Sequence, residues 1–395
     1  MSGKSGRLLV MLMITELCLG GGGRFTAMGW VSLRMVLFAL ALIVCADLLI
    51  RQKVILPIEI MKLIVGFAVM VCLGIIVGIA RGGNLNNLVE DVKPLAYFLA
   101  LPFFYWSIHK EEIPAIEKLI RVTSLSMALV FVILVVLINS GLIPFLSFYK
   151  ATLASGELFY RGEITFFYKG FLFFGIGAIF YYFTETSKWS YLIFTFLVLA
   201  IMVSATRGLL LSLGLTFSSY FLLTKSNLKS ALWFAFACLI FIWGSALIVA
   251  GSRWLDAGQT SKSYHEANPN LLGDRNYSDN GRITQIKEVK QRFSISSAMV
   301  GHGFGNGIPS RPIHMEIAYL EILHKQGLIG LAFWASFAAS IFRQYRQALP
   351  SPSTHAFFFS AVFIFVESFT NQYINNPIGM SMLLLSWVGL NKLRK

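Results

Sequence analysis

The sequence predicts an all-α membrane protein with about twelve transmembrane helices, and its composition and apolar patterning carry this prediction. The chain has 395 residues, of which 56% are hydrophobic and only 13% are charged. A soluble domain of this length would have about a quarter of its residues charged. The apolar residues also recur along the whole chain, in runs long enough to cross about 30 Å of hydrocarbon. The surface of such a chain must face lipid.

Long apolar runs alternate with short polar segments from one end of the chain to the other. The runs long enough to span a bilayer lie near residues 30–50, 57–80, 119–143, 164–184, 207–224, 230–250, 317–342, 355–371 and 376–390. Shorter candidates lie at 8–19, 94–108 and 189–204. We expect the first of these to be retained, because the glycines at 20–23 lead into another span instead of a signal-peptide cleavage site.

The distribution of lysine and arginine predicts how the chain is oriented. If the N-terminus is cytoplasmic and the helices alternate, the inside loops hold roughly twice as many of these cations as the short outside loops. The chain then comprises transmembrane helices 1–9 over residues 1–250, a periplasmic loop over 251–315, and helices 10–12 over 316–395. Topology explains much of the net charge of +14, so we expect no nucleic-acid partner.

The long loop 251–315 carries further cations that topology does not explain, because long loops are exempt from the charge rule. Residues 256–281 are rich in turn formers and are expected to be irregular. Residues 282–293 instead predict a helix with one stripe formed by Ile283, Ile286, Val289, Lys290 and Phe293. This helix either lies at the membrane interface or packs on the helix bundle.

Arginines in several predicted outer segments are candidates for binding an anionic group. Arg207 lies at the outer end of a predicted span, where it either snorkels to the headgroups or lines a cavity. A guanidinium group stays charged and binds phosphate oxygens bidentately. The candidates for a phosphate or pyrophosphate site are Arg161, Arg207, Arg282, Arg292 and Arg311.

Acid and base residues cluster where the span 317–342 begins, in the stretch HMEIAYLEILHKQGLIGLAFW from His314. At helical spacing, Glu316 would share a face with Tyr319, Leu320 and Leu323, and Tyr319 would line the substrate cavity. Carboxylates at a membrane need a cavity, a partner or a function. We expect Glu316 to pair with an arginine, to act as a general base, or only to complement the helix dipole.

Sequence motifs for metal sites, disulfides and nucleotide phosphates are missing. Cys18, Cys45, Cys72 and Cys238 lie in apolar runs without a C-x-x-C or histidine partner, which predicts buried, inert thiols. The glycine run GHGFGNG at 301–307 lacks the G-K-[ST] ending of a P-loop. A flexible, tightly turning entry to the membrane explains this run better, and we expect no metal and no cofactor.

With these residues in place, the chain resembles the superfamily of O-antigen polymerases and O-antigen ligases (Wzy and WaaL) of bacterial inner membranes. The resemblance covers most of the length and includes the large loop before the last three spans. SATRG at 204–208 is similar to the S-x-S-R-G of the family, and Arg282 lies in a D-N-G-R-I context. EIAYLEILHKQGLIGL is similar to the H-N-x-Y-L and G-L-x-G patterns of the ligases, but Glu316 occupies the position of the ligase histidine. The nearest upstream histidine is His314, and this departure favours the polymerase branch.

The resemblance implies a metal-independent membrane glycosyltransferase of the GT-C type. Its donor would be a glycan on undecaprenyl pyrophosphate, and its acceptor a repeat unit on the same carrier, with the active site facing the periplasm. The arginines would hold the pyrophosphate, and Glu316 or His314 would accept the proton of the acceptor hydroxyl. A chain-length regulator is a further partner that the resemblance suggests.

Two other functions remain open at this point. An O-antigen ligase would use the same donor but transfer the glycan to the lipid A–core acceptor. A transporter of lipid-linked sugars would show inverted repeats and broken spans in matching halves, and the sequence shows no such symmetry.

Overall fold

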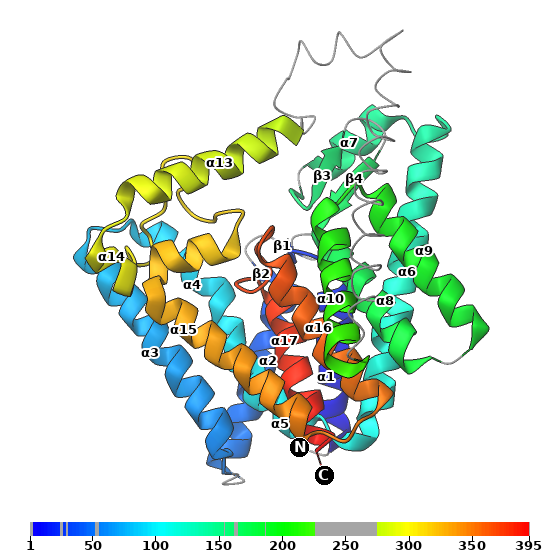
Figure 1. The fold of residues 1–395 in the computed structure, drawn as a ribbon, viewed down its shortest axis with the longest axis horizontal. Helices are drawn as coiled ribbons and strands as arrows, with labels where there is room; N and C mark the ends of the chain where they lie inside the picture. The colour runs from blue at the N-terminus through cyan, green and yellow to red at the C-terminus, as the bar shows by residue number, and fades with distance from the viewer. Residues whose placement is uncertain are drawn as a thin grey trace. The chain divides into compact units, whose positions relative to one another are not determined.

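The computed structural model describes residues 3–23, 27–28, 31–51, 55–153, 155–161, 165–185, 187–225 and 275–394, and this part of the chain is mostly helical (Figure 1). The α-helices are α1 (Gly3–Leu19), α2 (Leu33–Ile50), α3 (Ile58–Ala80), α4 (Leu85–Leu95), α5 (Leu101–Ser107), α6 (Ile113–Asn139), α7 (Phe145–Leu153), α8 (Leu172–Thr184), α9 (Lys188–Val203), α10 (Arg207–Lys225), α13 (Arg275–Arg292), α14 (Ile295–Val300), α15 (Ala318–Gln347), α16 (Pro352–Glu367) and α17 (Pro377–Lys392). Short 3-10 helices are η1 (Ala96–Ala100), η2 (Lys110–Glu112) and η3 (Lys169–Phe171). Antiparallel hairpins are formed by β1 (Ala27–Met28) with β2 (Val31–Ser32), and by β3 (Leu158–Arg161) with β4 (Thr165–Tyr168).

The chain divides into two compact units. The first consists of Met1–Met13, Arg34–Pro114 and Asp279–Lys395, and the second of Ile14–Leu33 and Ala115–Ser278. In the first unit, α15 packs against α3, α16 and α17. In the second, α8 packs against α9 and α10.

Several described helices are suited to a membrane. Those long and apolar enough to cross one are Leu33–Ile50, Ile58–Ala80, Lys110–Asn139 and Arg207–Thr224. Shorter apolar helices cover Lys169–Thr184, Lys188–Val203 and Pro352–Glu367. These helices agree with the predicted all-α membrane protein. The number of about twelve spans stays a prediction, and the predicted span 230–250 lies outside the described residues.

Four local features differ from the sequence-based expectations. The predicted span 164–184 begins as strand β4, because its first residues pair with β3. α13 begins at Arg275, inside the stretch expected to be irregular, while residues 256–274 lie outside the described residues. The predicted span 317–342 is interrupted at Gly327, whose φ of 64° and ψ of −158° are not helical. Cys72 is exposed on α3, whereas Cys18 and Cys45 are buried as expected and Cys238 is not among the described residues.

Helix α3 shows how an apolar helix can be packed on one side and face lipid on the other. Its buried residues, at three-, four- and seven-residue spacing, are Ile60, Phe67, Met70, Gly74 and Gly78. Its exposed surface is equally apolar and includes Ile76 and Ile79, at 62% and 56% exposure. An exposed surface of this composition is unfavourable in water and favourable in a bilayer.

The glycine run 301–307 packs tightly onto α3 and α15, so it is a fixed loop. Gly301, Gly303 and Gly305 have φ values of 73°, 82° and 81°, which confirms the predicted tight turns. The Phe304 N–H donates to the Gly74 carbonyl at 3.0 Å, and the Phe304 side chain is only 1% exposed. The expected flexibility is therefore wrong for this run, because α3 presents glycines that let the loop backbone approach closely.

We expect Gly78→Ala to destabilise the protein by about 1–3 kcal/mol, the usual range for an overpacked core. A Cβ at this position would lie 2.1 Å from the Phe304 carbonyl oxygen, a backbone atom that cannot rotate away. Gly66→Ala in the same helix is the matched control, because its Cβ would lie 3.6 Å from the Phe333 ring, at ordinary contact distance. Thermal unfolding of the detergent-solubilised variants measures the difference. Equal midpoints for the two variants would contradict the prediction.

Candidate active site

Glu316 is held by two arginines in the loop that precedes α15. Its Oε1 accepts a hydrogen bond from Nη2 of Arg311 at 2.5 Å, and its Oε2 lies 3.2 Å from Nε of Arg282. The backbone N–H of Glu316 donates to Oε1 of Gln285 at 2.9 Å. Arg282 and Gln285 both belong to α13, so this helix fixes both the main chain and the side chain of Glu316.

Glu316 is not part of the predicted helical face. α15 begins at Ala318, with Ile317 as its N-cap residue, so Glu316 lies before the helix and does not share a face with Tyr319. The physical reason is that two side chains of α13 bind Glu316. Gln285 accepts a hydrogen bond from its N–H, and Arg282 pairs with its carboxylate. We expected Glu316 to pair with an arginine, to act as a base or to complement the helix dipole. The structure shows the pairing, with Arg282 and Arg311.

A buried lysine lies directly behind this loop. Nζ of Lys325 is 2.7 Å from Oδ1 of Asp91 and 2.7 Å from Oε1 of Glu321, and the Lys325 side chain is 1% exposed. Lys325 and Glu321 lie one turn apart on α15, whereas Asp91 comes from α4. An ion pair buried to this extent is tolerated only when each charge is compensated by partners.

The same lysine also fixes the segment that carries the candidate residues. Nζ of Lys325 donates to the carbonyl oxygen of Ile313, the residue before His314. Asp91 in turn accepts from the N–H of Gly305 at 2.9 Å with its other oxygen, Oδ2. Burial raises the pKa of the Asp91 carboxyl, and the Lys325 ammonium and the Gly305 N–H act in the opposite direction. Lys325 and Asp91 together therefore join α4, α15, the glycine run and the 311–316 segment.

His314 lies beside these two carboxylates. Its Nδ1 is 3.6 Å from Oε1 of Glu321 and 3.9 Å from Oδ1 of Asp91. The side chain of His314 is 42% exposed, whereas those of the two acids are buried. A proton on Nδ1 would be directed at the carboxylates, which leaves Nε2 as the unprotonated nitrogen on the opposite side of the ring. Both acids therefore lie near the same ring nitrogen, at ion-pair distances.

Asp91, His314 and Glu321 each offer one ligand atom, and these atoms lie within 4.8 Å of one another. Such a group could hold a metal ion by spacing alone. However, the Lys325 ammonium bonds to the same two carboxylate oxygens that face His314. A divalent cation would have to displace this buried positive charge, so the residues present do not fit a metal site well.

Four consecutive backbone N–H groups of the glycine run, at 302–305, are already bonded within the protein. His302 donates to the His324 carbonyl at 2.6 Å, and Gly303 donates to the Lys325 carbonyl at 2.9 Å. With the N–H groups of Phe304 and Gly305 also bonded, these four donors are not free to bind a phosphate. Burial lowers the pKa of the His302 imidazole, and the neighbouring Arg81 adds to this effect.

The remaining predicted site residues lie in different surroundings. Nη1 of Arg292 donates to the Gly307 carbonyl at 2.8 Å, which joins α13 to the end of the glycine run. The Tyr319 hydroxyl donates to the Phe365 carbonyl at 2.8 Å, so this group is engaged with α16.

Arg161 and Arg207 belong to the second compact unit. Arg207 is exposed at the first position of α10, after a tight turn in which Ala205 has a φ of 54°. This turn agrees with a hairpin between α9 and α10. Only the backbone of Arg161 is described, in β3, where it pairs with Thr165. The expectation that these two arginines join the others stays a prediction.

Comparison of this chain with known proteins indicates the family that it resembles. No family model matches the chain. The chain is 27% identical to an O-antigen polymerase of Shigella flexneri over an alignment of 396 positions. The alignment covers 97% of this chain and 94% of that protein. The predicted resemblance to O-antigen polymerases is confirmed.

The similarity to an O-antigen polymerase extends over nearly the whole chain, so it includes both compact units. It agrees with the polymerase branch that Glu316 favours over the ligases. The buried acids and Lys325 form a part of the site that sequence reasoning missed. Glu321 and Lys325 form an acid–base pair at helical i,i+4 spacing inside an apolar run, and this signal could have identified them. Asp91 carried no comparable local signal.

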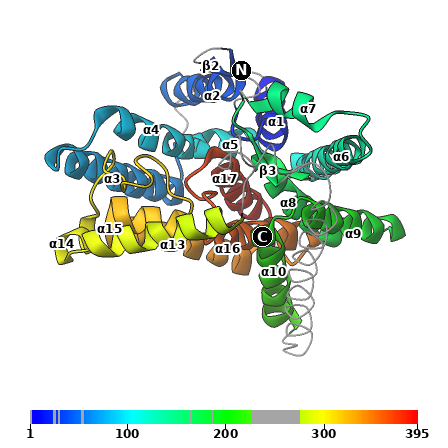
Figure 2. The same cartoon turned by 90° about the horizontal axis from the view of Figure 1, so that it is seen from above.

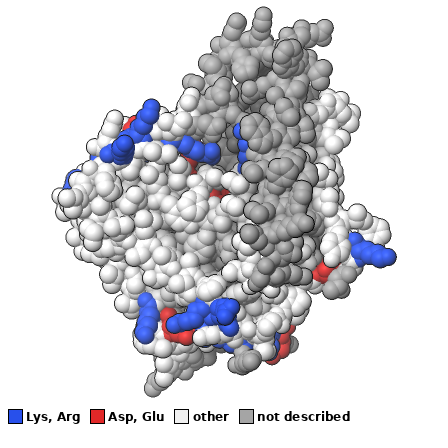
Figure 3. Space-filling view, in the orientation of Figure 1, with Lys and Arg blue, Asp and Glu red and all other residues white. Residues whose placement is uncertain are grey.

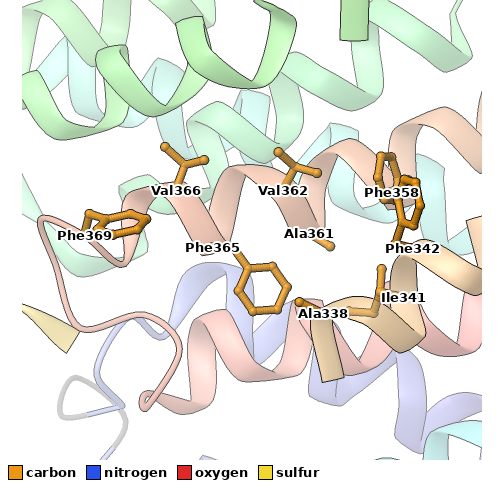
Figure 4. A pocket seen from close by; sticks show the side chains of 9 residues that line it. All are labelled: Ala338, Ile341, Phe342, Phe358, Ala361, Val362, Phe365, Val366 and Phe369. Carbon is orange, nitrogen blue, oxygen red and sulfur yellow. The ribbon is translucent and has the colours of Figure 1, made fainter. Parts of the chain in front are cut away.

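An apolar cavity of about 270 Å³ lies between α15 and α16 (Figure 4). Its lining consists of Ala338, Ile341, Phe342, Phe358, Ala361, Val362, Phe365, Val366 and Phe369. All of these side chains are apolar and cannot bind sugar hydroxyls. The cavity is therefore suited to hydrocarbon, and the polar groups of the candidate active site lie outside its lining.

Proposed function

We propose that the protein is an O-antigen polymerase that joins oligosaccharide repeat units carried on undecaprenyl pyrophosphate, at the periplasmic face of the inner membrane. The observation that carries this proposal is the similarity to an O-antigen polymerase over 97% of the chain. A polymerase needs a site for a leaving pyrophosphate and a base for the acceptor hydroxyl. Arg282 on α13 and Arg311 in the loop before α15 offer positive groups for the pyrophosphate. His314 in the same loop offers a base.

Arg282 and Arg311 bind the pyrophosphate in this proposal. Two guanidinium groups against the one carboxylate of Glu316 leave this group with a net charge of +1. Each guanidinium has five N–H donors, so contact with Glu316 leaves others for phosphate oxygens. The carboxylate also keeps the two arginines in place before substrate arrives. Preorganised donors of this kind stabilise charge that develops on a leaving group.

His314 is the proposed general base. Both oxygens of Glu316 already face arginines, so the carboxylate is engaged in positioning them. Nε2 of His314 is free of such competition if Nδ1–H points to Glu321 and Asp91. Glu316 then positions the arginines, and His314 accepts the proton.

The proposed reaction is a displacement at the anomeric carbon of the donor glycan. An acceptor hydroxyl oxygen forms a bond to this carbon as the bond from the carbon to the pyrophosphate oxygen breaks. The hydroxyl proton passes to Nε2 of His314, and undecaprenyl pyrophosphate leaves with the electron pair of the broken bond. Arg207, Arg161 and Arg292 are proposed as further contacts of the anionic carrier.

Replacing either Arg282 or Arg311 by alanine is expected to slow polymerisation by about 10²–10³-fold, the usual effect of removing one donor to a developing charge. Lysine variants should recover part of the rate, because they restore the charge but not the planar fork. The measurement is chain extension of lipid-linked repeat units by purified protein. Arg51→Ala is the control, since Arg51 is exposed and pairs only with Asp47 at 3.2 Å among the contacts described for it. Wild-type rates in both alanine variants would exclude these arginines as the pyrophosphate site.

We expect chelation of divalent cations to leave the rate of the purified polymerase unchanged. The reason is that arginine side chains supply the positive charge, while Lys325 occupies the space between the acids. The assay compares protein treated with EDTA and protein supplied with magnesium. A rate that falls with EDTA and returns with magnesium would refute metal independence.

Lipopolysaccharide from a deletion strain distinguishes the polymerase from a ligase. Loss of a polymerase leaves core capped with one repeat unit, whereas loss of a ligase leaves core without any repeat. Complementation with the wild-type gene should restore the long ladder. Absence of capped core in the deletion strain would overturn the proposed function.

A further inference from the structure

Helix α13 has three distinct faces, and one of them packs on the described part of the protein. Gln285 and Val289 are buried, and Val289 forms a small core with Ile308 and Met315. Arg282 lies on the same side and reaches Glu316. Of the predicted stripe, only Val289 belongs to this packed face, and it agrees with a helix resting on the bundle.

One flank of α13 is apolar and exposed. Ile283, Ile286 and Phe293 are 50%, 49% and 55% exposed, and they follow one another at three- and seven-residue spacing. The opposite flank is polar, with Thr284 and Gln291 exposed. A helix that only packs on a bundle needs one apolar face. An exposed apolar flank that lies between the packed face and a polar flank suits a helix lying in a membrane interface.

The apolar surface continues onto α14 at the end of a membrane-spanning helix. Ile295 and Met299 of α14 are 89% and 52% exposed. α14 packs against α3, and the residue after it, Gly301, accepts a hydrogen bond at 2.9 Å from Arg81 at the C-cap of α3.

The orientation of α13 and α14 relative to α3 fits helices that lie along a bilayer surface. α14 lies near the end of α3, and α13 leads away from it at a wide angle (Figures 1 and 2). The exposed apolar side chains of α3 reach almost to its end, at Ile79. The apolar surface of the span and that of α13 and α14 therefore meet at the level where the span leaves the hydrocarbon.

Basic residues accompany this surface. Lys287 and Lys290 are exposed on α13, next to the apolar flank. Lysine and arginine side chains gather where α13 runs across the visible face (Figure 3). Lysines beside an apolar strip attract anionic headgroups, each with about 1 kcal/mol near such a surface.

We propose that α13 and α14 form an interfacial anchor that rests in the headgroup layer of the bilayer at the end of α3. Ile283, Ile286, Phe293, Ile295 and Met299 enter the acyl boundary, and Lys287 and Lys290 bind anionic phospholipid headgroups. The packed face of the same helix presents Arg282 and Gln285 to Glu316. Lipid contact thus sets the height of the candidate active site above the hydrocarbon. This anchor does not depend on which reaction the site performs.

Spin labels on the full chain in nanodiscs test the anchor. A single cysteine is placed at Ile286 or Phe293 on the apolar flank, or at Thr284 or Gln291 on the polar flank, after the native cysteines have been replaced by serine. Collision with oxygen, which concentrates in lipid, is compared with collision with a water-soluble nickel chelate. We expect the labels at 286 and 293 to favour oxygen and those at 284 and 291 to favour nickel. Equal nickel access at all four positions, or burial of 286 and 293 from both reagents, would overturn the anchor.

A second measurement keeps the native cysteines. A photo-crosslinking amino acid replaces Phe293 in the full chain, and the products are identified by mass spectrometry. Phospholipid adducts support the anchor, whereas adducts to a second copy of the chain alone, or none to lipid, contradict it.

The headgroup charge is tested with the same labels. In nanodiscs with phosphatidylglycerol, Lys287→Glu combined with Lys290→Glu should make the label at 293 more accessible to nickel. The pair Lys110→Glu and Lys118→Glu, distant in sequence on η2 and α6, keeps the same net charge as a control. An identical response in nanodiscs of purely zwitterionic lipid would refute the role of anionic headgroups.

Discussion

Polymer formation by His314→Ala is expected to be about 10²–10⁴-fold slower than by the wild type, the usual contribution of a general base. Nδ1 of His314 lies 3.6 Å from Oε1 of Glu321 and 3.9 Å from Oδ1 of Asp91, which leaves Nε2 for the proton transfer that we propose. The side chain is 42% exposed, so its loss leaves the buried contacts of Lys325 in place. The protein should therefore stay folded while the reaction slows. The assay is single-turnover extension of a lipid-linked repeat unit by purified protein.

Comparison of variants separates a base from a residue with another role. His109→Ala is the matched control, because His109 is an exposed histidine on a different loop. Glu316→Gln should weaken substrate binding, because Glu316 positions the arginines. If His314→Ala were fully active and Glu316→Gln inactive, Glu316 would be the base.

Lys325→Met is expected to destabilise the protein by about 3–5 kcal/mol, the range found when one partner of a buried ion pair is removed. The substitution leaves the carboxylates of Asp91 and Glu321 buried without the ammonium that lies 2.7 Å from each. It also removes the donor to the Ile313 carbonyl, which holds the segment with Arg311, His314 and Glu316. Thermal unfolding in detergent and the amount of protein in membranes measure the loss.

Two further variants give this prediction its controls. Lys93→Met lies on α4 with Asp91 but removes only an exposed pair with Glu90 at 3.8 Å, so it should change stability by less than about 1 kcal/mol. The triple variant Asp91→Asn, Glu321→Gln and Lys325→Met removes all of the charges and should recover most of the lost stability. A Lys325→Met protein as stable as Lys93→Met would show that the buried ion pair has no structural role.

The variants His314→Ala and Lys325→Met are expected to fail in different ways. His314→Ala loses rate and keeps the fold, because His314 lies at the exposed edge of the cluster. Lys325→Met loses the fold first, because Lys325 joins α4, α15 and the 311–316 segment. If both variants lost stability equally, the division between a reacting residue and a supporting one would be wrong.

Local patterns in the sequence predicted much of the helical framework. The predicted spans 30–50 and 57–80 correspond closely to α2 and α3. Long apolar runs form helices in lipid because every backbone polar group must be bonded within the segment. The turns of the glycine run followed from its composition for a similar reason, since positive φ angles favour glycine.

The candidate site was only partly accessible from the sequence. Arg282, Arg311, His314 and Glu316 were identified as candidates, because charged residues beside a membrane span need a reason to be there. Their pairing could not be predicted, and the helical spacing that placed Glu316 beside Tyr319 was misleading. α13 holds Glu316 away from α15 through Gln285, and no periodicity within 314–334 contains that information.

The sequence by itself determined that this chain forms apolar helices suited to a bilayer, with cations and a few acids beside one of them. That information is local, because a segment's own composition and hydrophobic period decide whether it forms a helix in lipid. Only the tertiary structure decided that Lys325 bonds to Asp91, 234 positions away, and that His314 lies against the same acids. The physical reason is that an ion pair between distant segments depends on how helices pack, and side-chain volumes across the whole unit determine that packing.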